Sequence, residues 1–174
     1  MVSKKAQVWV ETVVYTLIVF AMIGLVLSFV KPKIDESKDR TVLEQSKRII
    51  EEINYKIEEI KMASGNKRIL SISIKKGSLN IDGENDRVFF DMESEYKYSE
   101  PGTRIEEDGL IFFTREKGDA YEVNMTQNYK NYNITFEGKD SLKKIHPAPR
   151  EYNLIISNQV KESSEKTIIN FELE

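Results

Sequence analysis

The sequence contains no cysteine, a single histidine, and only 4 prolines and 8 glycines among 174 residues. The absence of cysteine excludes disulfide bonds, thiolate zinc sites and cysteine nucleophiles. One histidine cannot form a multi-histidine metal site, and His146 lies in a stretch, Lys143–Pro149, that is predicted to be a loop. No Ser-His-Asp motif and no Gly-rich phosphate loop is present. We therefore expect no cofactor and no metal, and the chain is not expected to be an enzyme.

An excess of basic residues is also missing. The formal net charge is -3, and phosphate binding requires a concentrated basic surface. Nucleic acid is therefore not an expected partner. Lysine and arginine usually stand beside aspartate or glutamate, which is typical of a solvated surface of mixed charge.

The sequence does contain one long hydrophobic run, Val8–Val30, in which Glu11 is the only charged residue. At about 1.5 Å per residue its 23 residues extend roughly 35 Å as a helix, enough to cross a hydrocarbon core of about 30 Å. A cleaved secretory signal would have a shorter run and a small-x-small site after it. We therefore predict a membrane-spanning helix. The flanking lysines favour a cytoplasmic N-terminus.

Glu11 is unusual because a carboxylate within a membrane helix is costly and commonly functional. Its position near the start of the run leaves a second interpretation open, in which the side chain reaches water at the interface.

The segment Lys4–Glu11, with the sequence KKAQVWVE, resembles the start of archaeal type IV pilin-like proteins with a class III signal peptide. In that family a prepilin peptidase removes a short basic leader, the mature chain begins with Gln, and an acidic residue stands at mature position five. The matching cleavage falls between Ala6 and Gln7, and Glu11 takes the fifth place. Trp9 departs from the family, which often has a small hydroxyl residue there.

The resemblance implies a role for Gln7 and Glu11 in filament assembly. After cleavage, the new ammonium group at Gln7 would pair with Glu11 of a neighbouring subunit. Such a pair is strong where the dielectric constant is low, and it offsets part of the cost of burying each charge. The resemblance covers about 35 residues, through the hydrophobic helix.

A second helical pattern follows Pro32. Six positions share a heptad spacing, with a polar residue at one of them: Leu43, Ser46, Ile50, Ile53, Ile57 and Ile60. This amphipathic stripe is expected either to pack on the chain's own β domain, which we favour, or to form a coiled coil with a second copy. Gly65-Asn66 is predicted to stop the helix.

From Arg68 the hydrophobic period changes to two, which predicts short strands with one buried and one wet face. The predicted strands are Ile69–Ile74, Ser78–Ile81 (returning beside the first), Arg87–Met92, Glu95–Tyr98, Leu110–Arg115, Tyr121–Thr126, Tyr132–Glu137, Glu151–Ser157 and Lys166–Leu173. Turns are expected at Lys75–Gly77, Asp82–Asn85, Pro101-Gly102, Asp108-Gly109, Lys117-Gly118 and Gly138. This spacing favours an antiparallel sandwich or a small open barrel. The fold class is therefore α+β, with a long N-terminal helix before a mainly antiparallel, sandwich-like β domain.

Several short motifs have simpler explanations than chemistry. Asp82–Asp86 resembles the start of a calcium loop, but Arg87 stands where that loop needs glycine, so we predict a hairpin turn. Glu106–Gly109 is explained by a turn before the next strand. Asn124 and Asn133 begin N-glycosylation sequons and are candidate sites if the domain is extracellular.

The sequence thus predicts four segments: a leader (1–6), a transmembrane or filament-core helix (7–31), an amphipathic helix (32–64) and a soluble β domain (65–174). Our leading hypothesis is a structural subunit of an archaeal type IV filament, anchored in the cell membrane with its C-terminal domain outside. Its expected partners are a prepilin peptidase, an assembly ATPase with its membrane platform, and like pilins. The alternative is a non-polymerising anchored protein or minor pilin whose β domain binds the cell envelope or another protein.

Overall fold

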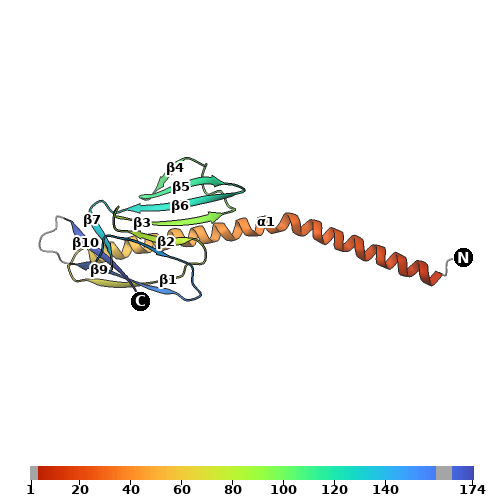
Figure 1. The fold of residues 1–174 in the computed structure, drawn as a ribbon, viewed down its shortest axis with the longest axis horizontal. Coiled ribbons are helices and arrows are strands. Elements are labelled where there is room, and N and C mark those ends of the chain that lie inside the picture. The colour runs from red at the N-terminus through yellow and green to blue at the C-terminus, as the bar shows by residue number, and fades with distance from the viewer. Residues whose placement is uncertain (1–3, 160–165) are drawn as a thin grey trace. The chain divides into compact units, whose positions relative to one another are not determined.

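The computed structural model describes residues 4–159 and 166–174, with side chains of the N-terminal helix from Val8 onward. These residues form one helix and ten strands (Figure 1). They are α1 (Lys4–Ile60), β1 (Lys67–Ile72), β2 (Ser78–Asp82), β3 (Arg87–Ser94), β4 (Arg104–Glu107), β5 (Leu110–Lys117), β6 (Ala120–Asn128), β7 (Tyr132–Phe136), β8 (Leu142–Ile145), β9 (Tyr152–Gln159) and β10 (Thr167–Leu173). The α+β prediction is confirmed.

The chain divides into two compact units, Met1–Lys38 and Asp39–Glu174, and α1 contributes residues to both. The helix continues through Pro32, although proline has no N–H to donate to the carbonyl four residues earlier.

The strands of the second unit are arranged in two sheets. Within the described residues, one sheet has the order β1-β9-β10-β7 and the other the order β4-β5-β6-β3-β2-β8. The pairs are antiparallel except for β10 with β7, which run parallel. The domain is therefore mainly antiparallel, as predicted.

The C-terminal part of α1 forms the centre of the domain's core. All six heptad positions predicted from the sequence are buried, including the polar Ser46, and Ile50, Ile53 and Ile60 are 0 % exposed. The helix contacts both sheets: Lys47 Nζ lies 3.0 Å from Glu107 Oε1 in β4, and Asn158 in β9 bonds to the last turn. Figure 1 shows strands of both sheets alongside this part of the helix. The predicted intramolecular packing is confirmed, and the stripe is not free to form a coiled coil.

Asn158 determines where α1 ends. Its buried side-chain Nδ2 donates to the carbonyls of Ile60, Lys61 and Ala63 at 3.0, 3.4 and 3.4 Å. These bonds satisfy carbonyls that a helix end leaves without partners. The α-helix therefore ends at Ile60, four residues before the predicted boundary at 64, and Gly65 follows with a positive φ of 86°.

Two strands were missed because they carry little hydrophobic signal. β4 is exposed along its whole length, and β8 has the sequence LKKI. Both lie at the edge of the six-stranded sheet, where short, charged strands are common because they discourage pairing with another chain. Glu106 and Glu107 therefore belong to a strand, and the predicted loop from Lys143 begins only after Ile145.

The predicted return of β2 beside β1 is wrong. β1 pairs with β9, whereas β2 pairs with β3 and β8, so the segment between β1 and β2 crosses from one sheet to the other. Gly77 allows this passage: its φ is 82°, and a Cβ atom there would lie 2.4 Å from the Asp91 carbonyl oxygen.

The predicted strand Glu95–Tyr98 is also wrong, because hydrogen bonds outside any sheet hold this segment. The buried Asp39 carboxylate accepts from the Glu95 N–H at 2.8 Å and from Lys76 Nζ at 2.6 Å. Ser94 Oγ accepts from the Tyr96 N–H at 2.9 Å and donates to its carbonyl. The long-range bonds of Asp39 and the local bonds of Ser94 together replace the ladder that a strand requires.

The predicted β2–β3 hairpin turn is confirmed, and Asp82 organises it. Its carboxylate is buried and accepts from Asn85 N–H at 3.2 Å, Asn85 Nδ2 at 2.9 Å and Arg87 Nε at 2.8 Å. Burial raises the pKa of Asp82, but the hydrogen bonds from Arg87 and Asn85 outweigh it and hold the pKa below its usual value.

We expect the Asp82→Asn variant to lose part of the acid sensitivity of the domain. A carboxyl whose pKa is lowered by folding contributes stability that is fully present above its unfolded pKa, about 3.9, and is lost as the pH falls through the folded pKa. Chemical unfolding of the detergent-solubilised chain at pH 7 and pH 3 measures this loss. The wild type should lose more stability between these values than Asp82→Asn, with the exposed Asp119→Asn as control. Equal losses in wild type and Asp82→Asn would contradict the assignment.

Candidate functional site

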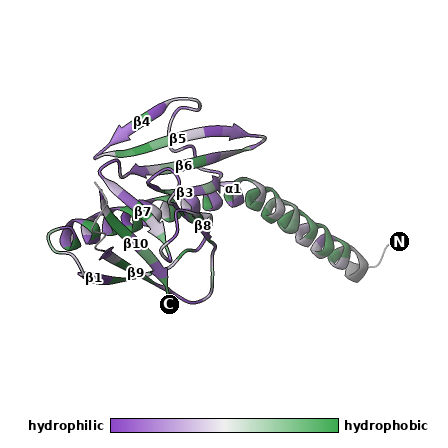
Figure 2. Ribbon diagram, turned by 60° about the vertical axis from the view of Figure 1, so that its left-hand side comes forward, coloured by the Kyte–Doolittle hydropathy of each residue, from purple (hydrophilic) through white to green (hydrophobic). Residues whose placement is uncertain are grey.

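The N-terminal part of α1 presents a hydrophobic surface on every side. Each side chain from Val8 to Val30 is exposed, and Figure 2 shows hydrophobic residues, in green, along this part of the helix. A surface helix of a soluble protein normally buries an apolar stripe. This segment is long and apolar enough to cross a membrane, as the sequence predicted. A hydrocarbon environment or other helices must cover it, because water disfavours so large an apolar surface.

Glu11 has a hydrogen-bond partner on its own helix. Tyr15, one turn later, donates its hydroxyl to Glu11 Oε1 at 3.1 Å. The bond compensates part of the cost of placing the carboxyl in an apolar surround. Three further hydroxyl groups of the segment, on Thr12, Thr16 and Ser28, donate to backbone carbonyls of the preceding turn. No hydroxyl among these needs a partner outside the helix, which suits a lipid environment.

The Ala6–Gln7 junction lies within α1, which begins at Lys4. The side chains of Ala6 and Gln7 fall outside what the structure describes. The predicted cleavage there, and the role of Gln7 in assembly, stay predictions.

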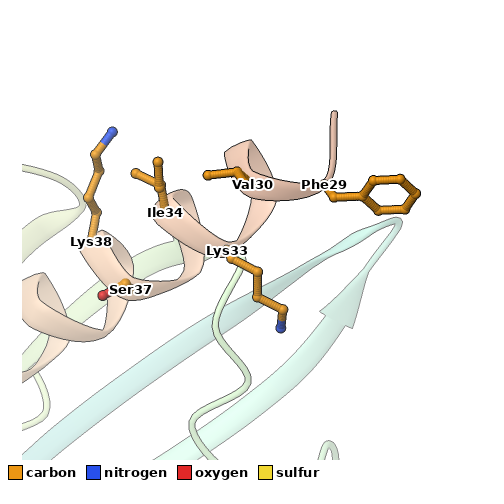
Figure 3. Close-up of a pocket in the computed structure, with 6 residues that line it drawn as sticks. All are labelled: Phe29, Val30, Lys33, Ile34, Ser37 and Lys38. Atoms are coloured by element: carbon orange, nitrogen blue, oxygen red, sulfur yellow. The ribbon is translucent and has the colours of Figure 1, made fainter. Parts of the chain in front are cut away.

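A shallow groove lies on α1 just after the hydrophobic run. Its lining residues are Phe29, Val30, Lys33, Ile34, Ser37 and Lys38. Figure 3 shows Val30, Ile34 and Lys38 projecting from one side of the helix, while Lys33 projects from the other. Each lysine is paired, Lys33 with Glu36 at 2.6 Å and Lys38 with Asp35 at 3.3 Å. The apolar surface thus ends among paired charges, as expected at a boundary between lipid and water.

The two sequons lie in different environments. Asn124, in β6, donates from Nδ2 to Asp91 Oδ1 at 2.7 Å, and its Oδ1 accepts from Thr126 at 2.6 Å. Asn133, in β7, makes a single long contact of 3.5 Å with Asp140. The Asn124 amide is therefore engaged within the sheet, and in the second sequon the buried Thr135 hydroxyl lies 2.8 Å from Asn170 Oδ1. Glycosylation at Asn124 or Asn133 stays a prediction.

The two remaining motifs, around His146 and Asp108-Gly109, lie in a loop and a turn that connect strands. His146 is exposed in the loop after β8, and its carbonyl accepts from the Tyr152 hydroxyl at 3.0 Å. The Asp108-Gly109 turn joins β4 to β5, and both residues have positive φ, 53° and 81°. Such a turn matches the twist of a hairpin.

One feature of the β domain was not predicted. A hollow of about 200 Å³ lies on the outer face of the six-stranded sheet, and we call it the outer-face hollow. Its lining residues come from β3 to β6 and are Arg87, Arg104, Ile111, Phe113, Asn124, Thr126 and Asn128. Sequence reasoning missed it because these residues come together only through strand register, which the alternation of residues does not give.

Comparison with models of protein families, with curated proteins and with solved structures finds no match to this chain. The architecture is nevertheless informative. A long N-terminal helix that is apolar and exposed in its first half, followed by a β domain built on its second half, is typical of pilins.

Proposed function

We propose that this chain is a structural, pilin-like subunit of an archaeal type IV filament. The observation that carries the proposal is the contrast between the two halves of α1. Every side chain from Val8 to Val30 is exposed, whereas the heptad stripe from Leu43 to Ile60 is buried in the chain's own core. One half of the helix is therefore committed to the domain, and the other half requires an external apolar partner.

That partner changes during the life of the proposed subunit. The helix is first stored in the cell membrane, with the N-terminus in the cytoplasm and the β domain outside. A prepilin peptidase removes residues 1–6. An assembly ATPase and its membrane platform then transfer the helix from lipid to a bundle of like helices. Gly24 has open space around it, which permits another helix to approach closely.

The resemblance at Lys4–Glu11 supplies the family, and the helix and β domain supply the architecture. Copies of this chain or related pilins are the proposed partners in the filament.

The mature N-terminus tests the processing step. We expect the chain isolated from membranes of its native host to begin at Gln7, as read by intact-mass and N-terminal peptide mass spectrometry. The Gln7 start should disappear in a strain that lacks the prepilin peptidase. A chain that begins at Met1, or that is cleaved after Val30, would contradict the proposal.

One observation favours a second function, that of an anchored accessory protein or minor pilin that does not polymerise. Glu11 already has an intrachain partner in Tyr15, so the carboxyl does not depend on a neighbouring subunit. Such a protein would also begin at Gln7, and its β domain would bind the envelope or another protein. Electron microscopy of sheared filaments with antibodies to the β domain separates the two, because only the first function labels filaments along their length.

A further inference from the structure

The outer face of the six-stranded sheet carries a group of polar and aromatic side chains that no assembly role explains. The inner face of this sheet contributes buried residues such as Phe90, Phe112 and Val123 to the core. The alternate positions point outward, and the outer-face hollow lies among them. The hollow belongs wholly to the β domain.

Strand register brings the lining residues together. Phe113 in β5 lies opposite Arg104 in β4 on one side and Asn124 in β6 on the other. Ile111 lies opposite Thr126, so an apolar side chain and a hydroxyl group lie next to each other in the lining of the hollow. Because cross-strand neighbours are about 4.5–5.5 Å apart at Cβ, one small ligand reaches several of these groups.

Arg87 and Asn128 close the hollow at one end, where they face each other across β3 and β6. Arg87 uses Nε to bind Asp82 at 2.8 Å, and its Cζ lies 4.9 Å from the Phe89 ring centre. Its two terminal nitrogens remain available to a ligand. The Asn128 side chain makes no hydrogen bond to any residue in the described part of the chain.

Arg104 supplies an uncompensated positive charge. Its Cζ lies 6.0 Å from the Phe113 ring centre, and within the described ranges its guanidinium forms no ion pair or hydrogen bond. The nearby carboxylates of Asp82 and Asp91 are engaged, by Arg87 and by Asn124 and Asn80 respectively. Asp91 keeps its charge, because its hydrogen-bond partners Asn124 and Asn80 are neutral amides. Glu106, two residues from Arg104 on the same strand, lies opposite Ile111. Asp91 and Glu106 are therefore the acidic neighbours that an anion at Arg104 meets.

We propose that the outer-face hollow binds an acidic saccharide, with the carboxylate of a uronic acid unit on the guanidinium of Arg104 and a hydroxyl of the saccharide on the terminal nitrogens of Arg87. Arginine suits this role because its planar fork matches a carboxylate. The sugar ring lies over Ile111 and Phe113, and its hydroxyls bond to Asn128 and Thr126. The hollow is smaller than the roughly 300–1,000 Å³ typical of drug-sized ligands, which suits a single sugar unit.

This inference does not depend on the filament role, because a subunit, a minor pilin or an anchored protein would all display the sheet. Failure of saccharide binding therefore leaves the Gln7 and Glu11 tests unaffected. The proposed saccharide site also gives the β domain a function, which is to bind acidic polysaccharides of a cell surface or matrix.

Titration of the full chain in detergent micelles tests the proposal. The probes are trigalacturonic acid and the neutral maltotriose, with binding measured by isothermal titration calorimetry and by NMR shifts of the saccharide. We expect trigalacturonate to bind and maltotriose to bind at least about tenfold more weakly, since a charge-assisted pair to arginine is lost. Binding should weaken with salt.

Two arginines that both contact Phe113 provide matched variants. Arg104→Gln should reduce trigalacturonate affinity at least about tenfold. Arg115→Gln should leave it unchanged, because Arg115 lies 5.8 Å from the Phe113 ring centre but pairs with Glu122 and does not line the hollow. Glu106→Gln should leave binding intact or strengthen it.

Four outcomes would overturn the proposal, three of which concern the saccharides and the variants. These three are the absence of trigalacturonate binding, equal loss of affinity in the two arginine variants, and equal binding of maltotriose. A glutamate-rich peptide that binds as tightly and competes at the same site would also overturn it, in favour of a protein partner.

Discussion

Replacement of Glu11 by glutamine is expected to reduce incorporation of the subunit into filaments at least about tenfold. Glutamine keeps the size of the side chain and its ability to accept from Tyr15, whose hydroxyl lies 3.1 Å from the carboxylate. It removes the negative charge that would attract the ammonium of Gln7 on the neighbouring subunit. Loss of one partner of a charge pair in an apolar surround costs about 3–5 kcal/mol, and about 1.4 kcal/mol already corresponds to a factor of ten.

The measurement is the amount of the chain in sheared filaments relative to membranes, in a filament-forming host whose own copy has been deleted. Glu11→Asp retains the charge and should restore part of the incorporation. Tyr15→Phe removes only the intrahelical donor and should have a much smaller effect than Glu11→Gln. Unchanged incorporation of Glu11→Gln would contradict the assembly role and favour the anchored, non-polymerising protein.

The second large effect concerns the stability of the β domain. Ile57→Ala is expected to lower the free energy of unfolding by about 2–5 kcal/mol, because it removes a side chain that is 1 % exposed and leaves a cavity in the core of the domain. Tyr55→Ala, two positions away on the same helix and 62 % exposed, should change it by less than about 0.5 kcal/mol. Helix propensity favours alanine over either residue, so the contrast reports burial.

Chemical unfolding of the full chain in detergent, followed by circular dichroism, measures the difference. Ile57→Val should fall between wild type and alanine, at about 0.5–1.5 kcal/mol. Similar values for Ile57→Ala and Tyr55→Ala would mean that the heptad stripe does not belong to the core of the domain. The oligomeric state should stay the same in all three variants, since the stripe packs within its own chain.

The heptad stripe illustrates which parts of this fold follow from local sequence. Leu43, Ile50 and Ile57 recur at a spacing that only one face of a helix produces, and burial follows that face without exception among the six positions. The predicted strands with strong alternation, such as those beginning at Arg87 and Leu110, also form as expected. Periodicity identifies an element and its buried face because both depend on neighbouring residues.

Which strands pair with each other depends on the whole chain, so the local sequence pattern does not predict it. β1 pairs with β9, whose partner residues lie 80 to 90 positions later, and β10 pairs in parallel with β7. Nothing in the sequence around Ile69 distinguishes β9 from β2 as its partner. The Glu95–Tyr98 segment has a strand-like sequence, but its Glu95 N–H donates to the Asp39 carboxylate on the helix. A contact between such distant residues leaves no periodic signal in the sequence.

The candidate functional residues also divide into those that local sequence identifies and those that only the folded chain brings together. Glu11 is prominent in the sequence because it is the one charge in an apolar run, and the i, i+4 spacing of Tyr15 is the sequence signal for its hydrogen-bond partner. The outer-face hollow required the register of four strands, since Arg87 and Arg104 are unremarkable in sequence. Arg104 lies in β4, whose four exposed residues gave no strand signal at all.

The four-stranded sheet joins the earliest strand of the domain to the last two, which sets an order of events during synthesis. β1 must wait for β9, so the ribosome has to extend the chain from Val30 to Tyr152 before the sheet can close. At about 5–20 residues per second this delay is on the order of ten seconds. The apolar segment therefore meets its surroundings while the domain that follows is still unfolded. For the proposed membrane-stored subunit, this order means that delivery to the bilayer would precede folding and that the β domain would cross the membrane as an unfolded chain.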